Sequence, residues 1–336
     1  MSNSTSKSFW TVALESSASD LHAVTDQHAM IRVDGLLRRI SNEPLTEQQV
    51  RELLRECLTA EHLALLAKEG TLECAHQLPS GERLRMSAHI VSGKPAFSAR
   101  LIPTSIPTLA SIRMPESVIE LCRIRHGLMI FTGPSGCGKS TSMAALLAAL
   151  AKAYAFHIVT LEDPIEYRFP RGLSLVSQRE LGMDFHSFGK ELSKLLRQDA
   201  DIVMVGEMRD LESMRHAISL AETGHLVFTT LHTADTIQTV DRIVASFPAD
   251  EQPLARNRLA ATLSSVVAQR LLPCLTGGRV ANREILIRTP AVSNMIRESR
   301  TAELRNVLET NADIGMTTFA RDLQTLAAEG LVPRGT

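Results

Sequence analysis

The feature that most constrains this chain is a glycine-rich loop, GPSGCGKS, at residues 133–140. The loop matches the pattern G-x-x-x-x-G-K-[ST], follows a short apolar run at 128–132 and precedes a stretch of helical composition. In that context the glycines allow backbone N–H groups to converge on phosphate oxygens at the positive end of a helix. The sequence therefore predicts a nucleotide phosphate site between a strand and a helix.

Two side chains of this loop are expected to carry its chemistry. Lys139 is expected to reach the β- and γ-phosphates of ATP. The Ser140 hydroxyl is expected to bind Mg²⁺, which prefers hard oxygen ligands. The residues expected to line the nucleotide are Gly133, Ser135, Gly136, Cys137, Gly138, Lys139, Ser140 and Thr141.

Short apolar runs without polar alternation surround the loop in sequence. Such runs are typical of strands that are buried on both faces of a sheet. A helical pattern over 208–222, followed by Gly224 as a stop signal, lies between two of them. Strands that alternate with helices predict an α/β fold with a parallel sheet. The runs are 128–132, 157–161, 202–206 and 226–231.

The first hundred residues have a different pattern, which predicts a separate α+β domain. The 336 residues are enough for about two domains. A capping box of Thr46 and Gln49 begins an amphipathic helix that we expect over 46–68. The other expected elements are a short helix and a hairpin with its turn at Asp34-Gly35 within 11–40, and strands at 83–91 and 96–102.

Three prolines in the segment 102–115 predict an interdomain linker and a natural hinge. The predicted organisation is thus an N-terminal domain over 1–101, this linker, and a second domain over 116–336. From residue 251 onward the pattern is mostly helical, with a short β-like interruption near 284–288. The final LVPRGT, 331–336, resembles a thrombin-cleavage linker used in protein expression, and we set it aside in predicting the fold.

Composition argues against several classes of function. Lys plus Arg (36) balance Asp plus Glu (37), and only 4% of residues are aromatic, which disfavours nucleic-acid binding. Five dispersed cysteines without a Cys-x-x-Cys pair argue against a disulfide framework and a zinc site, and fit a cytoplasmic location. The most apolar run, 143–156, is too short to cross a bilayer, so we expect membrane association only through a partner.

Carboxylates and histidines follow the predicted strands that neighbour the loop. Glu207 follows an apolar strand, where a Walker-B-type acid would face Mg²⁺. The segment TLEDPIEY, 160–167, ends the preceding strand with three carboxylates, and His225 and His232 flank the next strand. These residues favour an NTPase motor. A kinase that uses the same loop is the alternative, and it would require a pocket for a phosphoryl acceptor.

Taken in order, four segments resemble the Walker A, Asp-box, Walker B and His-box motifs of the type IV pilus and type II secretion ATPases. These segments are GPSGCGKST, TLEDPIEY, VGEMRD and AETGHLVFTTLHT. Within that family the chain resembles the PilT-type retraction ATPases, and the likeness spans about residues 18–330. The resemblance implies a PAS-like N-terminal domain, a RecA-like P-loop ATPase domain with C-terminal helices, and a homohexameric ring.

The resemblance also implies roles for individual residues. Glu207 would be the Walker B acid and would bind Mg²⁺ together with Ser140. Glu166 matches the Asp-box glutamate that positions or deprotonates the attacking water, whereas His225 and His232 match the pair that relays nucleotide state. Arg100 would reach phosphate across a domain or subunit boundary.

Several features are similar to the retraction branch of the family. The chain is short, lacks the extra N-terminal domain and tetracysteine insertion of extension motors, and carries AVSNMIRE (291–298), which resembles the AIRNLIRE motif with Ser293 and Met295 as departures. The resemblance implies an ATP-driven motor for pilus retraction and twitching motility, located in the cytoplasm and peripheral to the inner membrane through a platform protein. A PilT-like ATPase that powers protein secretion or conjugative transfer is the alternative.

Overall fold

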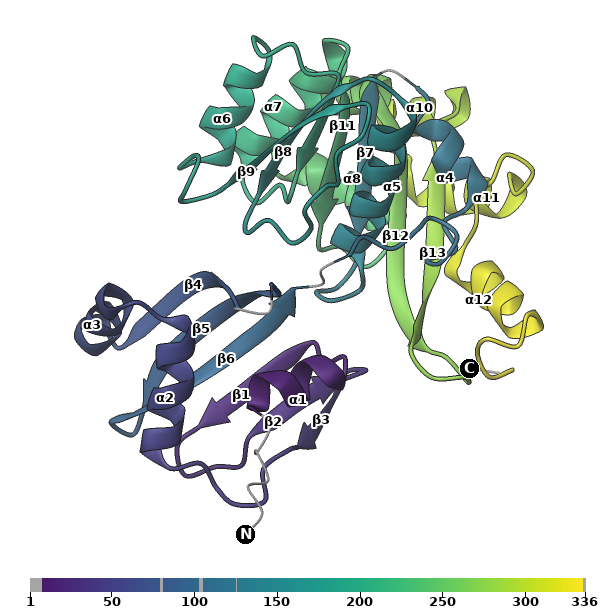
Figure 1. The fold of residues 1–336 in the computed structure, drawn as a ribbon. Helices are drawn as coiled ribbons and strands as arrows, with labels where there is room; N and C mark the ends of the chain where they lie inside the picture. The colour runs from purple at the N-terminus through teal and green to yellow at the C-terminus, as the bar shows by residue number, and fades with distance from the viewer. Residues whose placement is uncertain (1–7, 79–80, 103–104, 125, 335–336) are drawn as a thin grey trace. The chain divides into compact units, whose positions relative to one another are not determined.

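A computed structural model of the chain describes residues 8–78, 81–102, 105–124 and 126–334. The chain divides into two compact units, Met1–Ser105 (unit 1) and Ile106–Thr336 (unit 2) (Figure 1). Each unit has its own hydrophobic core. Both units combine helices with a sheet, so the predicted α/β class of the molecule is confirmed. Residues 103 and 104 of the expected linker, and the last two residues of LVPRGT, lie outside the described residues.

Unit 1 is built on a six-stranded antiparallel sheet in the order β3-β2-β1-β6-β5-β4. Its core includes Trp10, whose ring stacks on that of Phe97 with centroids 5.5 Å apart. Asp34 and Gly35 form the turn between β2 and β3, as predicted. The elements are α1 Phe9–Glu15, β1 Asp20–Val24, β2 Met30–Val33, β3 Leu36–Arg39, α2 Glu47–Cys57, α3 Ala60–Glu69, β4 Thr71–Gln77, β5 Arg83–Val91 and β6 Lys94–Ile102.

The single helix predicted over 46–68 is two helices, α2 and α3. The capping box of Thr46 and Gln49 is present at the start of α2. The helix ends because Leu58 takes an extended conformation and the Thr59 side chain accepts a hydrogen bond from the backbone N–H of His62, which caps a new helix. Apolar periodicity continues across this break, so the pattern alone did not reveal it.

Unit 2 is built on a seven-stranded sheet in the order β13-β12-β7-β11-β10-β8-β9, in which only β13 is antiparallel to its neighbour. All four predicted strands are present as β7, β8, β10 and β11, and they form its centre. Helix α7, Leu211–Glu222, lies within the stretch 208–222 that was predicted as helix, and it packs on β7 and β11. The strands are β7 Gly127–Thr132, β8 His157–Glu162, β9 Leu175–Glu180, β10 Ile202–Val205, β11 Leu226–Leu231, β12 Leu263–Pro273 and β13 Arg279–Ile287.

The helices of unit 2 connect and cover these strands (Figure 1). They are α4 Glu116–Leu121, α5 Lys139–Ala153, α6 Phe188–Leu195, α7 Leu211–Glu222, α8 Thr236–Ala245, α9 Gln252–Thr262, α10 Pro290–Arg297, α11 Leu304–Thr310 and α12 Phe319–Ala328, with a 3₁₀ turn η1 at Thr301–Glu303. No helix among the described residues has the length and apolar character that a membrane span requires.

The mostly helical pattern predicted after residue 251 is wrong for β12. This strand follows α9 without a loop, and its residues Leu263 to Gln269 are buried on both faces. The Ala, Leu, Gln and Arg residues around it favour a helix. Pairing with β7 on one side and β13 on the other overrides that local preference.

Residues of the predicted linker 102–115, and of the segment LVPRGT that was set aside in predicting the fold, pack into unit 2. Leu109 and Ile112 contact its core, and Met114 is buried in it. At the other end of the chain, Val332 is 2% exposed and packs with Leu326 of α12, in the segment that resembles a cleavage linker. The first residues of LVPRGT are therefore part of the fold.

Candidate nucleotide-binding site

Most of the predicted site residues lie at one edge of the unit 2 sheet, the edge formed by the carboxyl ends of its central strands. Strands β7, β8, β10 and β11 are parallel, so their carboxyl ends meet at this edge. The phosphate loop follows β7, TLEDPIEY begins within β8, Glu207 follows β10, and His232 follows β11. The edge thus combines a loop of backbone N–H groups with carboxylates and an imidazole.

The phosphate loop leads directly into α5 and holds its lysine inside. Gly138 is the N-cap residue of this helix. Lys139 is 8% exposed, and its Nζ donates hydrogen bonds to the carbonyl oxygens of Gly133 (2.7 Å) and Pro134 (3.0 Å). Burial lowers the pKa of the Lys139 ammonium, while the charges of nearby groups, Glu207 and Glu166 among them, act in the opposite direction. Glu207 and Glu166 are therefore carboxylates whose charge acts on Lys139.

The other predicted loop residues differ in how far their side chains are exposed to solvent. Ser135 and Gly136 are exposed at the tip of the loop, and Ser140 is half-buried. Cys137 is buried, so its side chain faces the protein and only its backbone is available to a phosphate. The Thr141 hydroxyl is hydrogen-bonded to that of Tyr167 at 2.9 Å, which ties the first turn of α5 to the segment after β8.

Glu207 lies in a charged cluster at the end of β10. One carboxylate oxygen is ion-paired with Arg209, and the other lies 3.5 Å from Nε2 of His232. Arg209 also forms an ion pair with Asp163 at 3.3 Å. The pKa of the Arg209 guanidinium is raised, chiefly by its hydrogen bond to Glu207. Arg209 thereby links the segment after β8 to the segment after β10.

The three carboxylates of TLEDPIEY have different environments. Glu162 is 5% exposed and accepts hydrogen bonds from the side chains of Thr160 (2.7 Å) and Gln178 (3.0 Å); burial raises its pKa. Asp163 pairs with Arg209. Glu166 is half-buried near the phosphate loop. Of the three, Glu166 therefore has the environment that best suits contact with a bound ligand.

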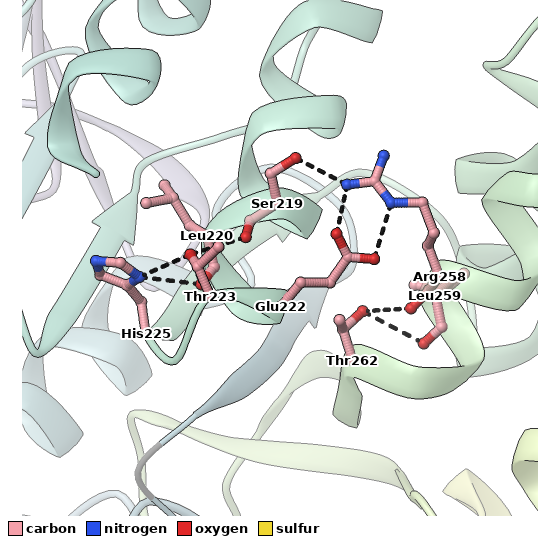
Figure 2. Close-up of polar contacts among 8 residues, drawn as sticks. All are labelled: Ser219, Leu220, Glu222, Thr223, His225, Arg258, Leu259 and Thr262. Atoms are coloured by element: carbon pink, nitrogen blue, oxygen red, sulfur yellow. Dashed lines mark hydrogen bonds and ion pairs between the residues drawn. The ribbon is translucent and has the colours of Figure 1, made fainter. Parts of the chain in front are cut away.

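The structure does not bring His225 to the phosphate loop. It precedes β11 at the amino edge of the sheet, about 20 Å from the carboxyl edge for a six-residue strand. Its Nδ1 is 3.0 Å from the carbonyl oxygen of Leu220 and 3.3 Å from the hydroxyl of Thr223 (Figure 2). In unit 1, Arg100 of β6 donates through Nε to Asp20 at 3.0 Å.

Two residues that the sequence analysis missed brace the site. Arg209 lies two residues after Glu207, at the start of the stretch 208–222 that was predicted as helix, and only the geometry shows that it joins two carboxylates. Gln269 of β12 hydrogen-bonds both the phosphate loop and α5. No signal pointed to Gln269, because its strand was predicted as helix.

The oxygen donors at this edge suit Mg²⁺. The described residues contain no cluster of three His, Cys, Asp or Glu side chains that would form a complete metal cage. In phosphate-binding sites Mg²⁺ commonly uses one or two protein oxygens and completes its shell with phosphate and water. A hydroxyl from Ser140 and a carboxylate from Glu207 match that donor set.

Comparisons with known proteins place this geometry in context. The model of the family described as Type II/IV secretion system protein matches residues 3–315. The type IV pilus retraction ATPase PilT of Pseudomonas aeruginosa is 40% identical over 94% of this chain and 92% of its own. The twitching motility protein of Neisseria gonorrhoeae is 39% identical over 90% of this chain and 81% of its own. A crystal structure of the pilus retraction motor PilT with bound ADP matches with a TM-score of 0.86, at 35% identity, over 97% of this chain and 93% of that one.

Proposed function

The chain belongs to the Type II/IV secretion system protein family, and from that premise we propose that it is an ATP-hydrolysing motor that retracts type IV pili and so supports twitching motility. The observation that carries the proposal is the edge of the unit 2 sheet, where the phosphate loop, Glu166, Glu207 and His232 converge. Two relatives named for pilus retraction or twitching match nearly the whole chain, including both units.

The residues of the site suit hydrolysis of a phosphoanhydride by positioning and charge. Within the described part of the chain, the hydrogen bonds of Lys139 Nζ go to two neutral carbonyl oxygens, so its positive charge is available to the phosphates of ATP. Mg²⁺, when bound by Ser140 and Glu207, supplies charge neutralisation at the phosphate oxygens. Glu166 is the residue we assign to orienting or deprotonating water, and His232, beside Glu207, is assigned to sensing nucleotide state.

We propose that the working form is a homohexamer. In one chain His225 lies far from the phosphate loop, and Arg100 is paired with Asp20. Roles in nucleotide response for these two residues therefore need a neighbouring subunit or a change of partner. The further assignments are a PAS-like unit 1, a RecA-like unit 2, and a cytoplasmic position at the inner membrane through a platform protein.

ATP hydrolysis in the absence of a phosphoryl acceptor is the activity that distinguishes the proposed motor from a kinase. Purified protein with Mg²⁺ and ATP should release inorganic phosphate slowly in the absence of any other substrate, and Lys139→Ala should remove both the activity and tight ADP binding. A matched control is Lys152→Ala, in the last turn of the same helix. Phosphate release that begins only after an acceptor is added would favour the kinase.

A further inference from the structure

A buried pair of polar side chains, Gln269 and Arg283, connects the phosphate loop to the segment that enters unit 2. The two residues are direct partners across β12 and β13, so their side chains emerge on the same face of the sheet. Both are nearly inaccessible to solvent, with 2% and 3% exposure. Arg283 Nε donates a hydrogen bond to Gln269 Oε1 at 3.2 Å.

On one side, Gln269 clamps the phosphate loop to the helix that follows it. Its Nε2 donates to the carbonyl oxygen of Cys137 at 2.6 Å, and its Oε1 accepts from the Ser142 hydroxyl at 2.9 Å. The amide orientation is fixed by these partners, because a flipped amide would turn its NH₂ group toward Arg283 and its oxygen toward a carbonyl. Gln269 is therefore bonded to the phosphate loop and to α5 at the same time.

The phosphate loop also packs closely against β12 at Gln269. A Cβ atom at Gly133 would lie 2.2 Å from the carbonyl oxygen of Gln269, and one at Gly138 would lie 2.9 Å from its Nε2. Both glycines have positive φ angles, 137° and 87°. The loop therefore packs directly against Gln269, with no room for a side chain at either glycine.

On the other side, Arg283 holds the backbone that leads from unit 1 into unit 2. Its two terminal nitrogens donate to the carbonyl oxygens of Ile112 (2.9 Å) and Arg113 (3.0 Å). Its own backbone N–H donates to Asp322 of α12 at 2.7 Å. Arg113 forms an ion pair with Glu329, the C-cap residue of that helix. The segment is thus attached to Arg283 directly and to α12 through Arg113.

The guanidinium of Arg283 has no carboxylate bonded to its side chain among the described residues. Burial lowers its pKa to about 10, so it is still charged at neutral pH. A buried charge is costly unless it is well hydrogen-bonded, and here neutral oxygens of Gln269, Ile112 and Arg113 provide the bonds. A movement of any one of these acceptors leaves part of the charge unsatisfied, which makes the three acceptors interdependent.

We propose that Gln269 and Arg283 are positioning residues that couple the state of the phosphate loop to the backbone of residues 112 and 113. The proposal rests on the proposed ATPase function, because the γ-phosphate is the charge that differs between ATP and ADP at this loop. A shift of the loop on phosphate loss moves the Cys137 carbonyl, Gln269 follows it, and Arg283 transmits the change to the segment that carries unit 1.

Hydrogen exchange of the full-length protein tests this coupling. Amide exchange in residues 108–114 is measured with ADP and with a non-hydrolysable ATP analogue, each at a saturating concentration confirmed by binding in the same samples. The wild type should show at least about a fivefold difference in exchange between the two states. Gln269→Leu should abolish that difference while these amides keep their protection, because Arg283 still binds the segment.

A second variant and a matched control make the result specific. Arg283→Lys keeps the charge but cannot reach three acceptors, so it should lose both the nucleotide-dependent difference and part of the basal protection. Arg258→Lys changes a half-buried arginine at the opposite edge of the sheet, bonded to Glu222 and Ser219 (Figure 2), and should leave exchange in 108–114 as in the wild type.

The outcomes separate the coupling from the function on which it rests. A wild-type chain that binds neither nucleotide would refute the proposed function. Normal binding together with an unchanged exchange difference in Gln269→Leu or Arg283→Lys would refute the coupling alone. The coupling is equally refuted if Arg258→Lys abolishes the difference to the same extent.

Discussion

Glu162 and Glu207 lie at the same edge of the unit 2 sheet, but they differ in burial and in their side-chain partners, and they therefore suit different roles. Glu162 is buried, its pKa is raised by desolvation, and its Oε1 accepts hydrogen bonds from the side chains of Thr160 and Gln178, which suits a structural role. The Glu207 side chain is one-fifth exposed; its carboxylate is ion-paired with Arg209 and lies close to His232. The accessible, ion-paired carboxylate is the one that suits Mg²⁺ and the hydrolysis step.

We expect Glu207→Gln to lower the rate of ATP hydrolysis by about 10²–10⁴-fold, because the neutral amide cannot replace the carboxylate that would hold Mg²⁺ at the phosphates. ADP binding should remain, since the phosphate loop and Lys139 are unchanged. Phosphate release and fluorescent-ADP binding measure the two effects. Glu222→Gln, at the opposite edge of the sheet, is the control and should hydrolyse ATP normally. A Glu207→Gln rate within tenfold of wild type would contradict the assignment.

The buried Lys139 predicts a pH dependence of nucleotide affinity. Burial lowers its pKa below the ordinary value of 10.5, and only the protonated amine attracts phosphate. Affinity should therefore be full near neutral pH and should fall as pH rises through the lowered pKa, at a lower pH than an exposed lysine would give. ADP titrations between pH 7 and 10.5, with circular dichroism to verify folding, measure this. Constant affinity over that range in folded protein would contradict the prediction.

At the scale of elements, periodicity and turn signals were sufficient to predict the central strands of the unit 2 sheet. They were not sufficient to predict β12, which lies toward one side of that sheet. Strands β7, β8, β10 and β11 are apolar runs between glycine or polar breaks, so the sequence alone predicted them and the site at their ends. Strand β12 was missed because its composition favours a helix and only its neighbours make it a strand. Gln269 and Arg283 lie in that border region and were missed with it.

The end of the chain gives a prediction at the same scale. Val332→Ala should lower the free energy of unfolding by about 1.5 kcal/mol, because the side chain is buried against Val280 and Leu326. The shift of the urea midpoint measures the effect. Leu275→Ala removes a leucine that is 62% exposed and should have little effect. Equal stability of the Val332→Ala protein and the wild type would show that LVPRGT is an appendage.

At the scale of the whole molecule, the proposed nucleotide site lies in unit 2, and the segment that leads into this unit is hydrogen-bonded to Arg283 at Ile112 and Arg113. A motor needs such a connection, because phosphate loss at the loop has to change the arrangement of larger parts. The matches to the family model and to the retraction ATPase PilT span residues of both units. The sequence motifs identified the ATPase, whereas the connection depends on side chains that only the folded chain brings together.

The most direct test of the central claim is to label pili in living cells of the organism that encodes this chain and to time their growth and shortening in the wild type and in a chromosomal Glu207→Ala strain. A retraction motor predicts that pili of the mutant still extend, fail to shorten and accumulate on the surface. Cells without pili would instead identify an extension motor, and unaffected pili would point to a secretion or transfer system; either result would contradict the account.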